Sequence, residues 1–129
     1  MSNSGPNTAF NAPLPDTQRD RRQFPRINVK WNGVIQAPGT PTKVKIIEIS
    51  EVGFAFVCDV AYQPGAELSF EISLPDPANG AQWHNVPGRL QVISSVLSRE
   101  GFRSGVIVKT ISSVHEQMLK SWVKIRLHE

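Results

Sequence analysis

Apolar and polar residues alternate along much of the chain between residues 27 and 110, and this pattern predicts β-structure. The clearest run is Leu68–Leu74, in which every second residue is apolar and the residues between are Ser, Glu and Ser. Such alternation is typical of a strand with one buried face. Similar runs, separated by Gly- and Pro-containing turns, predict further strands at residues 27–36, 43–49, 54–58, 83–96 and 102–110. Six short strands predict a small all-β antiparallel barrel, closed or nearly closed.

One apolar doublet interrupts this alternation. Ile46 and Ile47 are adjacent, although only one of them can face the core of a regular one-sided strand. We therefore expect a β-bulge at this point, or burial of both faces of the strand.

The end of the chain, residues 113–127, has helical rather than strand periodicity. Ser113 and Glu116 have the spacing of a capping box. Val114, Met118, Trp122 and Ile125 recur at helical spacing and would form one apolar stripe. A helix of this length is marginal alone, so we expect it to dock on the barrel, with Trp122 closing one end.

The beginning of the chain differs from the rest in composition. Residues 1–18 are rich in Asn, Ser, Pro and Ala and are predicted to be a disordered tail. Residues 19–26 form a flexible arginine-rich arm, in which Pro25 disfavours a helix. Residues 19–129 would then be a single domain composed of this arm, a barrel over 27–110 and a helix over 113–127.

Charge adds one further indication. The net charge is +3, and four arginines lie within eight consecutive residues at Arg19, Arg21, Arg22 and Arg26. An excess concentrated in this way hints at an anionic partner.

Several other classes of protein are disfavoured. Because Cys58 is the single cysteine, an internal disulfide is excluded. Cys58 lies on the same face of its predicted strand as Phe54 and Phe56, which indicates a core position. The three histidines show no ligand spacing with it, so we expect no metal site. No apolar run is long enough to span a membrane, and no secretion signal is recognisable.

Two short motifs give a more specific indication. The first is Arg22-Gln23-Phe24-Pro25-Arg26, with Arg21 before it, and the second is Glu48-Ile49-Ser50-Glu51-Val52-Gly53. In this order, with β-structure between them and a helix at the end, they resemble the PilZ domain family. That family carries R-x-x-x-R before its first strand and [D/N]-x-S-x-x-G between its second and third strands.

The resemblance implies a receptor for cyclic di-GMP, in which Arg21, Arg22 and Arg26 bind the ligand. Arginine suits this ligand because its guanidinium binds phosphate in a bidentate manner, pairs with guanine O6 and N7, and stacks on bases.

The second motif would supply the remaining contacts by the same resemblance. Ser50 would hydrogen-bond the ligand, and Gly53 would allow either a turn with positive φ or close approach of the ligand. Glu48 replaces the Asp or Asn of the family. Its carboxylate could accept hydrogen bonds from guanine, but the side chain is one methylene longer than that of Asp or Asn. This departure from the family pattern bears on affinity.

The resemblance implies a bacterial cytoplasmic receptor without enzymatic activity or cofactor. On ligand binding its arm would change position and signal to a protein partner. An alternative is a PilZ-like adaptor that binds proteins but not cyclic di-GMP. Binding to a nucleic acid polymer is disfavoured because the most regular strand would expose Glu67 and Glu71.

Overall fold

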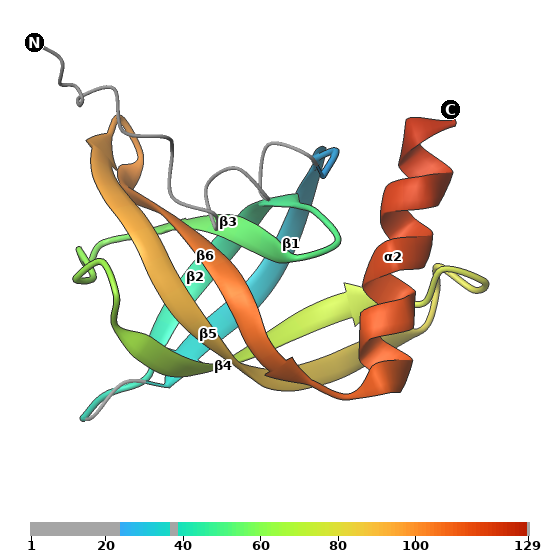
Figure 1. Cartoon of the computed structure of the whole chain (residues 1–129), viewed down its shortest axis with the longest axis horizontal. Helices are drawn as coiled ribbons and strands as arrows, with labels where there is room; N and C mark the ends of the chain where they lie inside the picture. The colour runs from blue at the N-terminus through green and yellow to red at the C-terminus, as the bar shows by residue number, and fades with distance from the viewer. Residues whose placement is uncertain (1–23, 37–38, 129) are drawn as a thin grey trace, which may run out of the picture.

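The computed structural model describes residues 24–36 and 39–128, which form six strands followed by one helix (Figure 1). The elements are β1 (Ile27–Gln36), β2 (Thr42–Ile49), β3 (Gly53–Cys58), β4 (Glu67–Pro75), β5 (Trp83–Ser98), β6 (Gly101–Ile111) and α2 (Ser113–Leu127). The six predicted strands and the predicted helix are therefore confirmed, with boundaries that differ by no more than a few residues.

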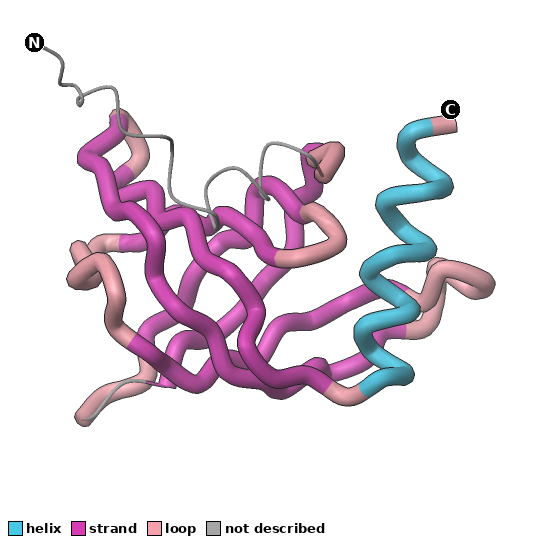
Figure 2. Tube along the Cα trace, in the orientation of Figure 1, coloured by secondary structure: helices cyan, strands magenta, loops and turns pink. Residues whose placement is uncertain are grey.

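The strands close into an antiparallel barrel, as the sequence predicts (Figure 2). Their order around the barrel is β1-β2-β3-β6-β5-β4. Alternate residues fill its interior. The Leu68–Leu74 run behaves as expected, because Phe70, Ile72 and Leu74 are buried, while Glu67 and Glu71 on the same strand are exposed. Cys58 lies in the same core, as predicted from the face that it shares with Phe54 and Phe56.

The expected bulge is present in β2 and determines where Glu48 lies. Ile46 pairs with the core residue Phe56, but the next partners across the β2–β3 ladder are Glu48 and Ala55. The extra residue is Ile47. In a regular ladder Ile47 would pair with Ala55, and Glu48 would then stand opposite the buried Phe54. The bulge instead places the carboxylate on the outer face and returns Ile49 to the core, where it is fully buried.

Helix α2 covers a seam between β1 and β4. These strands pair only between Gly33–Gln36 and Ser69–Ile72. Beyond that point the Trp122 indole donates a hydrogen bond of 2.6 Å to the carbonyl oxygen of Pro75, at the end of β4. Its ring meets Trp31 of β1 edge-on, with centroids 6.1 Å apart. Trp122 thus packs at one end of the barrel, where the sequence suggested it would lie.

A second side chain of α2 bonds to the other strand of the seam. The Arg126 guanidinium donates a hydrogen bond of 3.0 Å to the carbonyl oxygen of Asn28 in β1. The helix therefore supplies donors to carbonyls on both strands, in the stretch where their mutual ladder has ended.

Two details of the predicted helix are wrong. The N-cap is Ser112 and not Ser113, because the Ser112 hydroxyl accepts a hydrogen bond of 3.2 Å from the His115 amide. The Glu116 carboxylate instead forms an ion pair with Lys120, with Oε2 and Nζ 3.9 Å apart.

The predicted apolar stripe is also shifted around the helix. Val114 and Ile125 are 63% and 41% exposed, whereas Leu119 and Val123 are buried. The docking of Trp122 into the seam sets the rotation of the helix, and this turns the Leu119–Val123 side inward. Over the described residues, 24–36 and 39–128, no helix has both the length and the apolar character needed to cross a bilayer.

Candidate functional site

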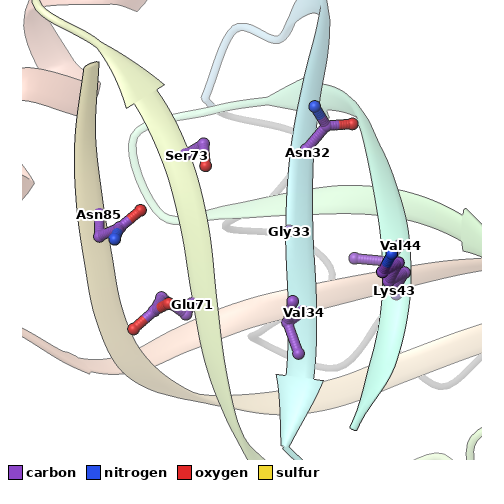
Figure 3. A pocket seen from close by; sticks show the side chains of 8 residues that line it. All are labelled: Asn32, Gly33, Val34, Lys43, Val44, Glu71, Ser73 and Asn85. Atoms are coloured by element: carbon purple, nitrogen blue, oxygen red, sulfur yellow. The ribbon is translucent and has the colours of Figure 1, made fainter.

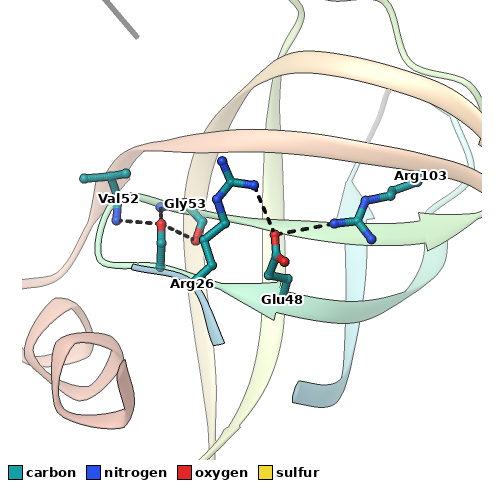
Figure 4. Close-up of polar contacts among 6 residues, drawn as sticks. Arg26, Glu48, Val52, Gly53 and Arg103 are labelled. Carbon is teal, nitrogen blue, oxygen red and sulfur yellow. Dashed lines mark hydrogen bonds and ion pairs between the residues drawn. The ribbon is translucent and has the colours of Figure 1, made fainter. Parts of the chain in front are cut away.

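The turn between β2 and β3 is organised by Ser50. Its hydroxyl oxygen accepts hydrogen bonds from the amides of Val52 at 3.3 Å and Gly53 at 3.2 Å (Figure 4). Its own amide donates to the carbonyl oxygen of Gly53 at 2.9 Å. Serine hydroxyls favour such local turns because they satisfy backbone donors that the ladder leaves free. Ser50 is only 7% exposed, and its hydroxyl holds the turn that carries the motif through these hydrogen bonds.

Gly53 is required by packing rather than by backbone conformation. Within the described residues positive φ angles occur at Gly39, Gly65 and Gly101, and the suggestion of a positive φ at Gly53 is therefore wrong. A Cβ on Gly53 would instead overlap the carbonyl oxygen of Val106 and lie 3.1 Å from Ile107 Cα, both in β6. The glycine lets the start of β3 approach β6 at close range.

Glu48 lies between two arginines on the outer face. Its Oε1 atom is 3.6 Å from Nη1 of Arg26 and 3.4 Å from Nη2 of Arg103 (Figure 4). The Glu48 side chain is 20% exposed, and those of Arg26 and Arg103 are 40% and 46% exposed. One carboxylate oxygen thus holds two guanidinium groups, which leaves the cluster with a net positive charge.

Arg103 was not identified from the sequence. It reaches the site because β6 pairs with β3 and places Arg103 opposite Val57, two residues from Ala55. No local pattern around Arg103 signals this position. Only the strand order and register would have identified Arg103 as a site residue, and these cannot be read from a single sequence.

Of the predicted site residues, the structure brings Arg26, Glu48, Ser50 and Gly53 to one corner. All four line the same small cavity, together with Ile49 and Phe54. Arg21 and Arg22 lie outside the described residues. The cavity has a volume of about 10 Å³, which is room for about one water molecule. A larger ligand at this corner would therefore lie on the surface rather than inside the barrel.

Small residues form a row beside Glu48, in which Ser94 is half-buried and Ala55 and Gly105 are buried. Directly paired residues of antiparallel strands share one face, and Glu48, Ala55, Gly105 and Ser94 form such a row across β2, β3, β6 and β5. The next row contains Val57, Arg103 and Val96. We call the row Ala55–Gly105–Ser94 the shelf. Arg103 lies in the row next to the shelf, and Arg26 contacts Glu48 at one end of it.

Other reactive groups do not form a comparable cluster. Burial raises the pKa of the Cys58 thiol above its ordinary value, which fits a core residue rather than a nucleophile. His84 contacts Asp76 at 2.8 Å near the β4–β5 loop. In the part of the chain that the structure describes, no three His, Cys, Asp or Glu side chains are grouped so as to hold a metal ion.

A second polar surface lies over the outer side of β1, β2, β4 and β5. It is a groove of about 410 Å³ whose lining includes Asn32, Lys43, Glu71, Ser73 and Asn85 (Figure 3). None of the predicted site residues lines it.

Comparison with known proteins identifies relatives of this fold. The family model described as PilZ domain matches residues 20–124. No curated protein matches the sequence. Among solved structures, the inhibitor of motility MotI/DgrA of Bacillus subtilis superposes with a TM-score of 0.74 at 21% identity, over 84% of this chain. YcgR of Escherichia coli in complex with c-di-GMP gives a TM-score of 0.66 at 17% identity, also over 84% of this chain. The isolated PilZ domain of YcgR with c-di-GMP gives 0.56 at 13% identity, over 84% of this chain and 92% of its own.

The first two of these proteins are longer than this chain. The chain spans 52% of the MotI/DgrA chain and 46% of the YcgR chain. At these identities the likeness shows the shared fold, and the residues of the site have to be argued from their own geometry.

Proposed function

This chain belongs to the PilZ domain family, and on that premise we propose that it is a receptor for cyclic di-GMP. The observation that carries the proposal is the convergence of Arg26, Ser50 and Gly53 at one corner of the barrel, with Arg103 beside them on the other side of Glu48. Two structural neighbours, the full YcgR chain and its PilZ domain, hold c-di-GMP, which supports the same choice of ligand.

The chemistry of the corner suits this ligand. Cyclic di-GMP presents two phosphates and two guanines, and a guanidinium can bind either group in a bidentate manner. Arg26 and Arg103 lie on either side of Glu48, so a ligand that took the place of the Glu48 carboxylate would meet a donor from each arginine.

The motif residues have separate tasks in this proposal. Ser50 and Gly53 shape the turn and keep it close to β6, and the predicted contact between Ser50 and the ligand would be made from this turn. Arg21 and Arg22 precede Arg26 by a few residues and would add phosphate or base contacts when the arm closes over the ligand.

The output would be binding to another protein, and not catalysis. Closing the arm over the shelf would change the surface that a partner meets, and this requires different ligand affinities in the two arm positions. We propose that the protein does this in the bacterial cytoplasm, without a cofactor, because its ligand is an intracellular second messenger.

Isothermal calorimetry tests the proposal. Cyclic di-GMP, GTP and a short single-stranded oligonucleotide would each be titrated into the protein. We expect saturable binding of cyclic di-GMP alone. Arg26→Ala and Arg22→Ala should each weaken it by about 10- to 100-fold, since a hydrogen bond to a charged group contributes about 1.5–3 kcal/mol.

Arg89→Ala is the matched control, because Arg89 lies on β5 and bonds to Ser69, away from the shelf. Circular dichroism would confirm that each variant is folded. Equal affinity in wild type and Arg26→Ala would refute the site, and saturable binding of the oligonucleotide would refute the choice of ligand.

One observation favours the second candidate, an adaptor that does not bind cyclic di-GMP. Both described arginines of the site are already paired with Glu48. The same titration decides between the two candidates, because such an adaptor would give no heat with any of the three ligands.

A further inference from the structure

The ion pairs of Glu48 suggest a regulation of the same site. Glu48 Oε1 meets Nη1 of Arg26 at 3.6 Å and Nη2 of Arg103 at 3.4 Å. Both guanidinium groups therefore already meet an anionic oxygen in the ligand-free protein. A carboxylate and a phosphate compete for the same donors of a guanidinium, because each offers a pair of negatively charged oxygens to its parallel N–H groups.

We infer that Glu48 is an internal competitor of the ligand, which holds Arg26 and Arg103 together across the site and lowers the affinity for cyclic di-GMP. This inference rests on the proposed function. It gives Glu48 a role opposite to that of a ligand contact, because the side chain would have to release both arginines before they could bind phosphate or guanine.

Three features of the structure support this role. The bulge in β2 places Glu48 on the outer face opposite Ala55, at the edge of the shelf. The two arginines come from distant parts of the chain, one directly before β1 and one within β6, so Glu48 links the arm side of the site to its far side. Glu48 is also the least exposed of the three side chains, at 20%, so its charge is screened less by water than those of its partners.

The neighbouring Glu51 provides a matched control. It lies in the same turn and carries the same charge, but it forms no ion pair with the described residues. Removing the charge of Glu51 changes the general electrostatics of the corner without releasing either arginine. A local competitor and a general charge effect therefore predict different results for the two positions.

The first measurement is the affinity for cyclic di-GMP of wild type, Glu48→Gln and Glu51→Gln, by isothermal calorimetry at one ionic strength. Each exposed ion pair is modest, and releasing two should tighten binding by about three- to ten-fold in Glu48→Gln. Glu51→Gln should stay within about two-fold of wild type, as expected for a solvated charge without a partner. Weaker or unchanged binding by Glu48→Gln would overturn the inference, as would equal tightening by both variants.

The second measurement needs no nucleotide. Phenylglyoxal modifies accessible arginines, and mass spectrometry gives the rate at each site in the ligand-free protein. Arg26 and Arg103 should react about two-fold faster or more in Glu48→Gln than in wild type, because each loses its partner. Arg99, at the β5–β6 turn, is the internal reference and should react at the same rate in both proteins.

The two measurements separate the two ideas. If no form of the protein binds cyclic di-GMP, the proposed function fails, and the arginine rates alone decide whether Glu48 holds the two side chains. Equal rates of arginine modification in wild type and Glu48→Gln would overturn the inference that Glu48 holds the two arginines.

Discussion

Replacing Gly53 by alanine is the most informative test of how the motif turn is built. The new Cβ would overlap the carbonyl oxygen of Val106 and come within 3.1 Å of Ile107 Cα. Both obstacles belong to the backbone of β6, which cannot rotate away as a side chain could. Either β3 and β6 separate at this point, or the turn that leads into β3 shifts.

The expected cost follows from these contacts. Overpacking costs about 1–3 kcal/mol. The hydrogen bond from the Val108 amide to the carbonyl oxygen of Val52, 2.9 Å long, lies at the same junction, and losing it would add about 1 kcal/mol. We therefore expect Gly53→Ala to lower the free energy of unfolding by about 3 kcal/mol, a large share of the roughly 5–15 kcal/mol of a typical domain.

Urea unfolding followed by circular dichroism measures this loss. Gly80→Ala is the control, because a Cβ there meets nothing within 4 Å and its φ is not positive. It should change the free energy of unfolding by less than about 1 kcal/mol. A Gly53→Ala protein as stable as the Gly80→Ala protein would refute the packing argument. If that stable variant also lost cyclic di-GMP binding, close approach of the ligand would be the better explanation for the glycine.

Three further predictions concern single contacts. Trp122→Phe keeps most of the ring but removes the donor to the Pro75 carbonyl oxygen, and should lower the free energy of unfolding by about 1–3 kcal/mol in urea titrations; an unchanged value would show that this hydrogen bond does not stabilise the docked helix. The hydrogen bond from His84 is the main cause that holds the pKa of the Asp76 carboxyl below its ordinary value of 3.8. The stability that this contact contributes is therefore complete above pH 3.8 and is lost as the pH falls through the lower pKa of the folded state. Thermal unfolding of wild type should therefore be more sensitive to acidification below about pH 4 than that of His84→Gln, and equal sensitivity would contradict the assignment. Arg103→Ala should weaken cyclic di-GMP binding by about ten-fold or more in calorimetry, and wild-type affinity would remove Arg103 from the site.

The barrel could be predicted from the sequence because its information is local. A period of two along Leu68–Leu74 is enough to identify a half-buried strand, and the Ile46–Ile47 doublet marks a place where the period of β2 breaks. Arg103, in contrast, belongs to the site only through the pairing of β6 with β3. That pairing depends on the packing of the whole barrel and leaves no mark in the residues around it.

The errors at α2 and Gly53 have the same origin. Two adjacent serines, Ser112 and Ser113, are equally good caps by type, and only the position of the docked helix selects the first. At Gly53, sequence reasoning considered the conformation of the residue and a ligand, whereas the actual constraint is the backbone of Val106 in a strand that comes much later in the chain.

The two hydrogen bonds from α2 to the seam have a consequence for the integrity of the barrel. Without the helix, the carbonyl oxygens of Pro75 and Asn28 would lose the donors that Trp122 and Arg126 now supply. Strand margins with unsatisfied backbone groups are templates for pairing with other chains. Truncation of the protein after Ile111 should therefore promote self-association, with copies joined edge to edge along β1 and β4.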